Sequence, residues 1–308
     1  MAETKSRHEI LRFFKSEGIK LGTVSGVLTT KPSLIEWVDK AVPIDLITTK
    51  SYQVNPNPGH REPIIVEPEV GCYGNAVGLR NPGMEKGFYD LWDLRSRYAL
   101  RSILNVSISA ASIDDFLLLI QKFESVADIL ELNFSCPHAA AGYGASIGSD
   151  PALVRDYVKE LRSSTEAVLF VKLTPNVEKI GSMAEAAVNS GADGISAINT
   201  LGPEIFREPH TGEPVLYNPD NHKGGKSGRW ITTIALGKIR EIRRAVGDSI
   251  PIIGMGGITS GSDVRLMMEA GADVIGIGSV LARLQTEEIP AFIAALKDDC
   301  LKGTDRAS

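Results

Sequence analysis

Short apolar segments rich in β-branched residues alternate along the chain with longer segments whose apolar residues recur at helical spacing. Most of the short segments are apolar throughout, which is typical of parallel strands that are buried on both faces. The eight segments predicted as strands are residues 20–25, 44–49, 103–108, 128–134, 167–173, 194–198, 251–255 and 273–277. Amphipathic helices are expected between them, for example over 112–123, 151–163 and 233–246. This alternation predicts βα units around a parallel sheet.

One joint between a helix and a strand occurs twice. The sequence Asn189-Ser-Gly-Ala-Asp-Gly-Ile195 resembles Glu269-Ala-Gly-Ala-Asp-Val-Ile275, and in both a glycine would end the helix just before a strand. With eight strands, this repeat favours a single-domain (β/α)₈ TIM barrel over residues 1–308. A doubly wound open sheet is the alternative, but no Gly-x-Gly-x-x-Gly follows the first predicted strand. Residues 200–228 hold four prolines and follow the sixth strand, so we expect an active-site loop or small insertion there.

Composition narrows the class of protein. The 308 residues include 33 Lys+Arg and 38 Asp+Glu, a net charge of −5, which argues against nucleic acid or an anionic membrane as the main partner. No apolar segment is long enough for a membrane span, and the amino-terminal residues lack an apolar signal core. Three scattered cysteines provide neither a disulfide framework nor a metal site, and we expect Cys72 and Cys300 to be structural. These features predict a cytoplasmic protein without a bound metal.

Polar residues follow most of the predicted strands, at the end where barrel enzymes form their active sites. Because unpaired polar groups are costly to bury, we expect a ligand to satisfy them. The residues concerned are Ser25, Gly26, Lys50, Ser51, Asn133, Cys136, Lys172, Asn199 and Thr200.

Glycines follow the seventh and eighth strands, as Gly256-Gly257 and Gly278-Ser279. Glycine lets backbone N–H groups approach an anion, and a following helix N-terminus adds a favourable dipole. The pattern therefore predicts a phosphate-binding site, either for flavin mononucleotide (FMN) or for a phosphorylated substrate. The alternative is that these glycines only form tight turns.

The reactive side chains allow more than one chemistry. Lys50 and Lys172 would form a Schiff base, or stay charged beside a cofactor ring, or extend to solvent. Cys136 would act as a general base or simply fill space as a small buried side chain. Asn75 and Asn199 offer the donor and acceptor needed to bind an amide or imide edge, although each residue is also common in turns.

Five ordered blocks between Gly22 and Leu284 resemble the dihydroorotate dehydrogenase family, in particular its soluble class 1 members and most closely class 1B. The blocks are Asn75-Ala-Val-Gly-Leu-Arg-Asn-Pro-Gly83, Glu131-Leu-Asn-Phe-Ser-Cys-Pro137, Val171-Lys-Leu-Thr-Pro-Asn-Val177, Ile198-Asn-Thr200 and Ile252-Ile-Gly-Met-Gly-Gly-Ile258. The resemblance implies an FMN-binding (β/α)₈ barrel that oxidises (S)-dihydroorotate to orotate in pyrimidine biosynthesis.

The resemblance also implies roles for individual residues. Cys136 would remove the C5 proton while C6 delivers hydride to the flavin N5, and Lys172 would lie beside the flavin ring. The residues that would hold the pyrimidine are Lys50, Asn75, Asn133, Asn199 and Thr200, with the backbone of Gly78 and Leu79 near its carboxylate. Those that would bind FMN are Ser25, Gly26, Lys50, Ser51, Lys172, Gly225, Gly256, Gly257, Gly278 and Ser279.

Two positions depart from the family pattern. His138 stands where class 1 enzymes have asparagine, and dihydropyrimidine dehydrogenases, which act on uracil and thymine, carry the same Ser-Cys-Pro-His sequence. Lys226 replaces a leucine of the class 1B Gly-Gly-Leu-Ser-Gly segment, which leaves the electron acceptor open. The class 1B resemblance implies a homodimer and an electron-transfer subunit with FAD and an iron–sulfur cluster that passes electrons to NAD. A dihydropyrimidine dehydrogenase-like flavoenzyme is the first alternative, and a flavin-free Schiff-base lyase or isomerase of a phosphorylated substrate is the second.

Overall fold

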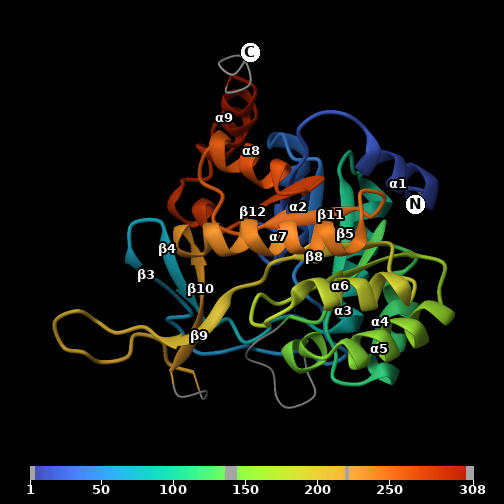
Figure 1. The fold of residues 1–308 in the computed structure, drawn as a ribbon, viewed down its shortest axis with the longest axis horizontal. Coiled ribbons are helices and arrows are strands. Elements are labelled where there is room, and N and C mark those ends of the chain that lie inside the picture. Colours follow the sequence, from blue (N-terminus) through green and yellow to red (C-terminus); the bar gives the residue numbers. More distant parts are fainter. Residues whose placement is uncertain (1–3, 136–143, 219–221, 303–308) are drawn as a thin grey trace.

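Eight parallel strands close into a barrel with helices on its outside (Figure 1). The computed structural model describes residues 4–135, 144–218 and 222–302. All eight predicted strands are present, and the predicted (β/α)₈ barrel is confirmed; the alternative open sheet is wrong because the first and last barrel strands pair with each other. In order around the barrel the strands are β1 (Leu21–Thr23), β12 (Val274–Ile277), β11 (Ile252–Met255), β8 (Gly194–Ala197), β7 (Val168–Lys172), β6 (Ile129–Asn133), β5 (Ile103–Ile108) and β2 (Leu46–Thr48).

The helices of the outer layer follow the strands in turn. They are α2 (Pro32–Ala41), α3 (Met84–Arg97), α4 (Ile113–Phe123), α5 (Pro151–Ser163), α6 (Ile180–Asn189), α7 (Thr232–Val246), α8 (Gly261–Glu269) and α9 (Ile289–Lys302). The Ser112 hydroxyl caps α4 by accepting the Asp115 amide at 3.1 Å. Gly191 and Gly271 follow α6 and α8 with φ of 106° and 110°, a conformation that favours glycine. The repeated joint therefore has the structural role that its sequence predicts.

Helix α1 (Arg7–Lys15) closes the end of the barrel where the strands begin. It is amphipathic, and its buried Ile10 and Phe14 pack among side chains of the barrel interior. The Phe14 ring lies 5.2 Å from the ring of Phe170 on β7, measured between centroids. Because apolar side chains fill this end, the interior is open to a ligand only at the opposite end.

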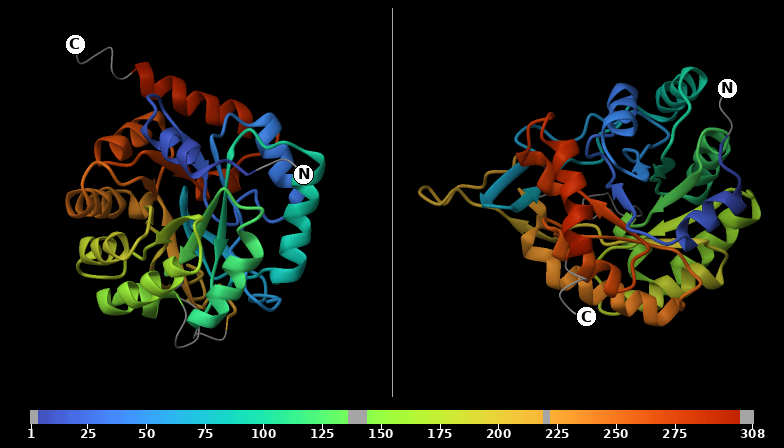
Figure 2. Two further views of the ribbon diagram at one scale, coloured as in Figure 1. Left: turned by 90° about the vertical axis from the view of Figure 1, so that its right-hand side faces the viewer. Right: turned by 90° about the horizontal axis from the view of Figure 1, so that it is seen from above.

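A second sheet covers that opposite end, and we call it the roof sheet. It is antiparallel, in the order β3 (Ile65–Glu69), β4 (Cys72–Asn75), β10 (Lys223–Gly228) and β9 (Leu201–Ile205) (Figure 1). Residues 200–228 thus contain two strands, and the chain that follows β9 extends away from the barrel as a long arm (Figure 2). Strands β3 and β4 join the roof sheet from the connection after β2, and they were not predicted from the sequence.

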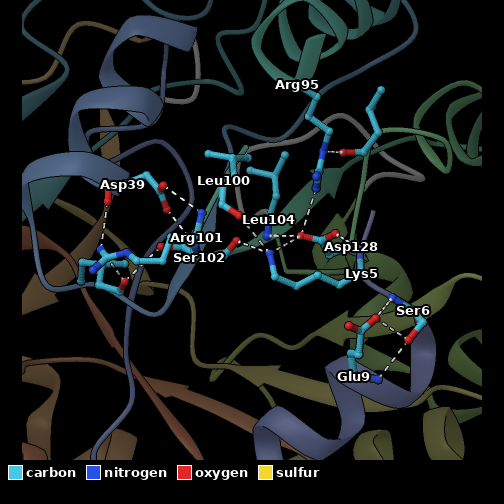
Figure 3. Close-up of polar contacts among 12 residues, drawn as sticks. Lys5, Ser6, Glu9, Asp39, Arg95, Leu100, Arg101, Ser102, Leu104 and Asp128 are labelled. Carbon is cyan, nitrogen blue, oxygen red and sulfur yellow. Dashed lines mark hydrogen bonds and ion pairs between the residues drawn. The ribbon is translucent and has the colours of Figure 1, made fainter. Parts of the chain in front are cut away.

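Buried charges at the closed end are held by several partners each (Figure 3). Asp39 of α2 accepts hydrogen bonds from the amides of Arg101 and Ser102 at 2.9 and 2.8 Å and from the Tyr98 hydroxyl at 2.7 Å. Burial alone would raise the Asp39 pKa, but these hydrogen bonds outweigh it and lower the pKa on balance. The ionised carboxylate therefore ties α2 to the start of β5.

None of the helices in the described part of the chain is long and apolar enough to cross a membrane.

Candidate functional site

A cavity of about 1000 Å³ lies between the open end of the barrel and the roof sheet. It is large enough for a nucleotide-sized cofactor together with a small substrate. The structure brings eleven of the predicted site residues to its wall: Ser25, Gly26, Lys50, Asn75, Lys172, Asn199, Thr200, Gly256, Gly257, Gly278 and Ser279.

The remaining predicted residues lie elsewhere. Ser51, Gly78, Leu79, Asn133 and Gly225 are close to the cavity in the fold but are not part of its wall. Cys136, the predicted base, lies outside the described residues, as does His138.

The cavity wall is strongly cationic although the chain as a whole is acidic. Among its described residues there is no aspartate or glutamate. The basic residues of the wall are Lys31, Lys50, Arg80, Lys172, Arg229 and Arg283. Two of the six are neutralised by side chains behind the wall, since Arg80 pairs with Glu62 at 3.2 Å and Arg283 with Glu67 at 3.3 Å. A cavity of this kind favours a ligand with more than one negative charge.

Lys172 ends strand β7 and is only 4% exposed. No hydrogen bond or ion pair joins its ammonium group to any described residue, and the side chain lines the cavity. Because a buried charge without a partner is costly, this lysine fits a role toward a bound ligand better than a role in packing. The prediction that Lys172 extends freely to solvent is wrong.

Backbone amides after β11 and β12 offer an anion site. The N–H groups of Gly256, Gly257 and Gly278 have no acceptor among the described residues, and all three glycines line the cavity. At the N-terminus of α8, the side chains of Ser260 and Asp263 form a capping box. Backbone amides of this kind are suitable donors to a phosphate.

A chain of side-chain hydrogen bonds fixes the predicted amides around the barrel mouth. Asn133 donates to the Ser51 hydroxyl at 3.0 Å and accepts from the Ser135 hydroxyl at 2.6 Å. Asn199 in turn donates to the Ser135 hydroxyl and backbone oxygen at 3.0 and 3.1 Å. Ser51 also contacts Ser107 at 2.9 Å. These contacts hold the ends of β2, β6 and β8 in one arrangement before any ligand binds.

Gly225 lets the roof sheet approach the barrel closely. A Cβ atom at this position would lie 2.1 Å from the Thr200 hydroxyl, and the Gly225 carbonyl accepts the Asn75 amide at 3.4 Å. The close approach to Thr200 is enough to explain why residue 225 is glycine, and a contact between Gly225 and a phosphate is not needed for that explanation.

Gly78 and Leu79 form a turn with φ of 69° and 54°. The His60 imidazole packs against Gly78 so closely that a Cβ atom there would lie 2.7 Å from the ring, and its Nδ1 is 2.9 Å from the Ala76 oxygen. His60, which lies in the loop before β3, therefore supports this turn.

Several polar residues of the site were missed from the sequence. Tyr73 and Ser227 line the cavity from the roof sheet, and Ser135 links the two asparagines. Inside the barrel, the fully buried Glu131 carboxylate accepts the Asn105 amide at 3.2 Å. A lone serine or tyrosine leaves no pattern in a sequence, whereas Glu131 stands out as the only charged residue in an apolar strand, β6.

The closed barrel, with a buried lysine and a cavity at its open end, has the architecture of a barrel enzyme. Comparison with known proteins is more specific. The family model described as dihydroorotate dehydrogenase matches residues 20–298. The chain is 39% identical to the catalytic subunit of dihydroorotate dehydrogenase B (NAD(+)) from Methanocaldococcus jannaschii over 234 residues, 76% of this chain and 74% of that protein. It is 40% identical to the same subunit from Pyrococcus horikoshii over 235 residues, 76% of this chain and 74% of that protein.

A crystal structure of ligand-free DHODH from Eimeria tenella has the same fold, with a TM-score of 0.76 at 19% identity, and the match covers 93% of this chain and 85% of that one. The chain belongs to the dihydroorotate dehydrogenase family, a family of oxidoreductases, and the predicted family resemblance is confirmed.

Proposed function

We propose that this protein oxidises (S)-dihydroorotate to orotate in pyrimidine biosynthesis, with FMN as its bound cofactor. The observation that carries the proposal is the cationic cavity wall, which has no carboxylate among its described residues. FMN brings a phosphate and dihydroorotate brings a carboxylate, so both match this wall. Neutral dihydrouracil lacks the second anion, which favours the orotate reaction over the dihydropyrimidine alternative.

The described residues fit FMN. The free amides of Gly256, Gly257 and Gly278, with the Ser279 hydroxyl, suit its phosphate, and Lys172 suits the electron-rich edge of its ring. Bound FMN would supply the hydride acceptor for substrate C6. We assign the remaining cofactor contacts to Ser25, Gly26, Lys50, Ser51 and Gly225.

We assign the proton transfer to Cys136, which would take the proton from C5 so that the C5=C6 bond forms. The pyrimidine would be held by Lys50, Asn75, Asn133, Asn199 and Thr200, with its carboxylate near the Gly78–Leu79 turn. Because protein contacts already fix Asn133 and Asn199, these amides would be positioned before the substrate arrives.

The relatives are named as catalytic subunits of dihydroorotate dehydrogenase B (NAD(+)), which supports the proposal that this chain has a partner subunit. We propose that this chain forms a homodimer and passes electrons to NAD through a subunit that carries FAD and an iron–sulfur cluster. The buried free thiols of Cys72 and Cys300 support a reducing compartment, for which we propose the cytoplasm.

Anaerobic mixing tests the proposed reaction. The purified yellow protein is mixed with dihydroorotate, and separately with dihydrouracil, while flavin absorbance is followed. We expect bleaching by dihydroorotate, and a rate about 10²–10⁴-fold lower for Cys136→Ser, as for loss of a general base. Cys300→Ser changes a buried thiol in α9 and should keep the parent rate.

Bleaching by dihydrouracil alone would overturn the proposed substrate. A colourless protein in which borohydride traps a substrate on lysine would overturn the flavin reaction and favour the Schiff-base lyase.

A further inference from the structure

His60 holds the Gly78–Leu79 turn through three contacts with the residues that lead into it. Its backbone N–H donates to the Val77 oxygen at 3.1 Å. Its Nδ1 donates to the Ala76 oxygen at 2.9 Å, since a carbonyl can only accept. Its ring covers Gly78 so closely that a Cβ atom there would lie 2.7 Å from the ring. One residue therefore fixes three consecutive residues at the start of the turn.

The turn has a conformation that its own sequence does not favour. Gly78 and Leu79 have φ of 69° and 54°, and a leucine is rarely found in this left-handed region. Such a residue keeps this conformation only where the surrounding structure holds it. Arg80, directly after the turn, is also held, since its guanidinium donates to the Pro58 and His60 oxygens at 2.8 Å each. The loop that carries His60 thus fixes the turn from both sides.

The shape of the turn matters because it carries free backbone donors. The N–H groups of Gly78 and Leu79 have no acceptor among the described residues. Val77 and Arg80, the residues on either side, line the cavity, so these donors lie at the edge of its wall. Consecutive backbone N–H groups in a turn form a concave site for an anion such as a carboxylate. That site exists only while the turn keeps its shape.

We propose that His60 is a positioning residue, which holds the Gly78–Leu79 turn in the shape that binds the substrate carboxylate and so makes the protein prefer dihydroorotate to uncharged dihydrouracil. His60 is not part of the cavity wall, and it acts through the backbone of the turn without touching the substrate. The inference rests on the proposed function, because it takes the substrate and the place of its carboxylate from there.

Binding to the holoprotein tests the inference without measuring turnover. Orotate and uracil are titrated separately, and the change in flavin absorbance reports binding. In His60→Ala, which loses the ring and its donor, we expect orotate to bind about tenfold to a hundredfold more weakly, as for loss of a hydrogen bond to a charged group. Uracil binding should be unchanged, because uracil has no carboxylate. His60→Asn keeps a side-chain N–H near the position of Nδ1 and serves where the alanine variant does not fold; a smaller loss, again for orotate alone, is expected.

His222, just before β10, provides a matched control. Its Nδ1 lies 2.8 Å from the Leu216 oxygen, which is the same kind of contact, but His222 is not part of the cavity wall. His222→Ala should therefore leave both affinities unchanged. Melting temperatures report whether each variant is folded.

Parent-like orotate affinity in a folded His60→Ala variant, or equal losses for orotate and uracil, would overturn the inference. If the parent protein itself binds uracil as tightly as orotate, the proposed substrate fails and not merely the role of His60.

Discussion

Replacing Lys172 with methionine tests whether this lysine serves folding stability or the reaction, because the melting temperature and the rate of flavin reduction should respond differently. The lysine is buried at the open end of β7 and has no partner among the described residues, so its charge contributes nothing to packing. Methionine has a similar length and no charge. We expect Lys172→Met to keep or raise the melting temperature, with a gain of up to about 2–4 °C for each kcal/mol of desolvation that is relieved.

The same change should slow flavin reduction. Loss of one preorganised group that stabilises developing negative charge typically lowers a rate by about 10²–10³-fold, or about 3–4 kcal/mol. Stopped-flow absorbance after anaerobic mixing with dihydroorotate measures this rate directly, and calorimetry measures the melting temperature of the same sample.

Lys20 is the matched control at the closed end of the barrel. It is 7% exposed, its pKa is lowered by burial, and its ammonium group donates to the Ser16 carbonyl. Lys20→Met should therefore lower the melting temperature and leave flavin reduction unchanged. A destabilised Lys172→Met that reduces flavin at the parent rate would refute the reasoning, because the lysine would then be structural.

Three further changes test other parts of the structure. Asp39→Asn should lower the free energy of unfolding by about 1–3 kcal/mol at pH 7 in urea titrations. Since the pKa of this carboxyl is lowered in the folded protein, the difference from the parent should persist above about pH 4 and vanish as the pH falls through the lowered value. Gly225→Ala should destabilise the protein by about 1–3 kcal/mol and release flavin, because its Cβ would meet Thr200. Gly237→Ala is the control, since a Cβ there has open space, and it should be neutral or slightly stabilising. Thermal melts of both variants measure the difference. Lys50→Ala should weaken orotate binding by about tenfold or more and uracil binding only slightly, since only orotate carries a negative charge for the lysine. Fluorescence titrations measure both affinities, and equal losses would contradict this role of Lys50.

The barrel was predictable because its strands are buried on both faces. Strands β5, β6 and β7 are buried at every position, so their sequences carry an almost unbroken apolar signal. The glycines of the repeated joint, Gly191 and Gly271, also indicated where a helix ends and the next strand begins. The short strands β1 and β2 were each predicted three residues too long, because β-branched residues such as Val24, Ile44 and Thr49 lie next to them.

The roof sheet could not be predicted in the same way. β3 and β9 expose most of their residues, and β10 is mainly glycine and lysine, so none of them shows an apolar or alternating pattern. Their pairing is decided by the barrel, which brings two distant connections to the same end. Physical proximity, and not local sequence preference, forms these strands.

The part of the candidate site that lies on the barrel was predictable, and the part that depends on the roof sheet was not. Residues at the ends of barrel strands follow from the strands themselves, and Lys50, Lys172 and Asn199 do line the cavity. Ser51 and Asn133 lie next to the cavity wall and are joined by a hydrogen bond, a contact that no spacing in the sequence reveals. Tyr73 and Ser227 depend on the roof sheet and were missed with it.

The roof sheet also determines the stage of synthesis at which the cavity is complete. Asn75 and Gly225, which meet where β4 pairs with β10, are separated by 150 residues. During synthesis, a chain that has left the ribosome only as far as β8 has a barrel wall without its cover, and the last barrel strand arrives later still. The cavity wall includes residues up to Arg283, so the cavity is complete only after β12 has been made, and the proposed flavin would be captured after that stage.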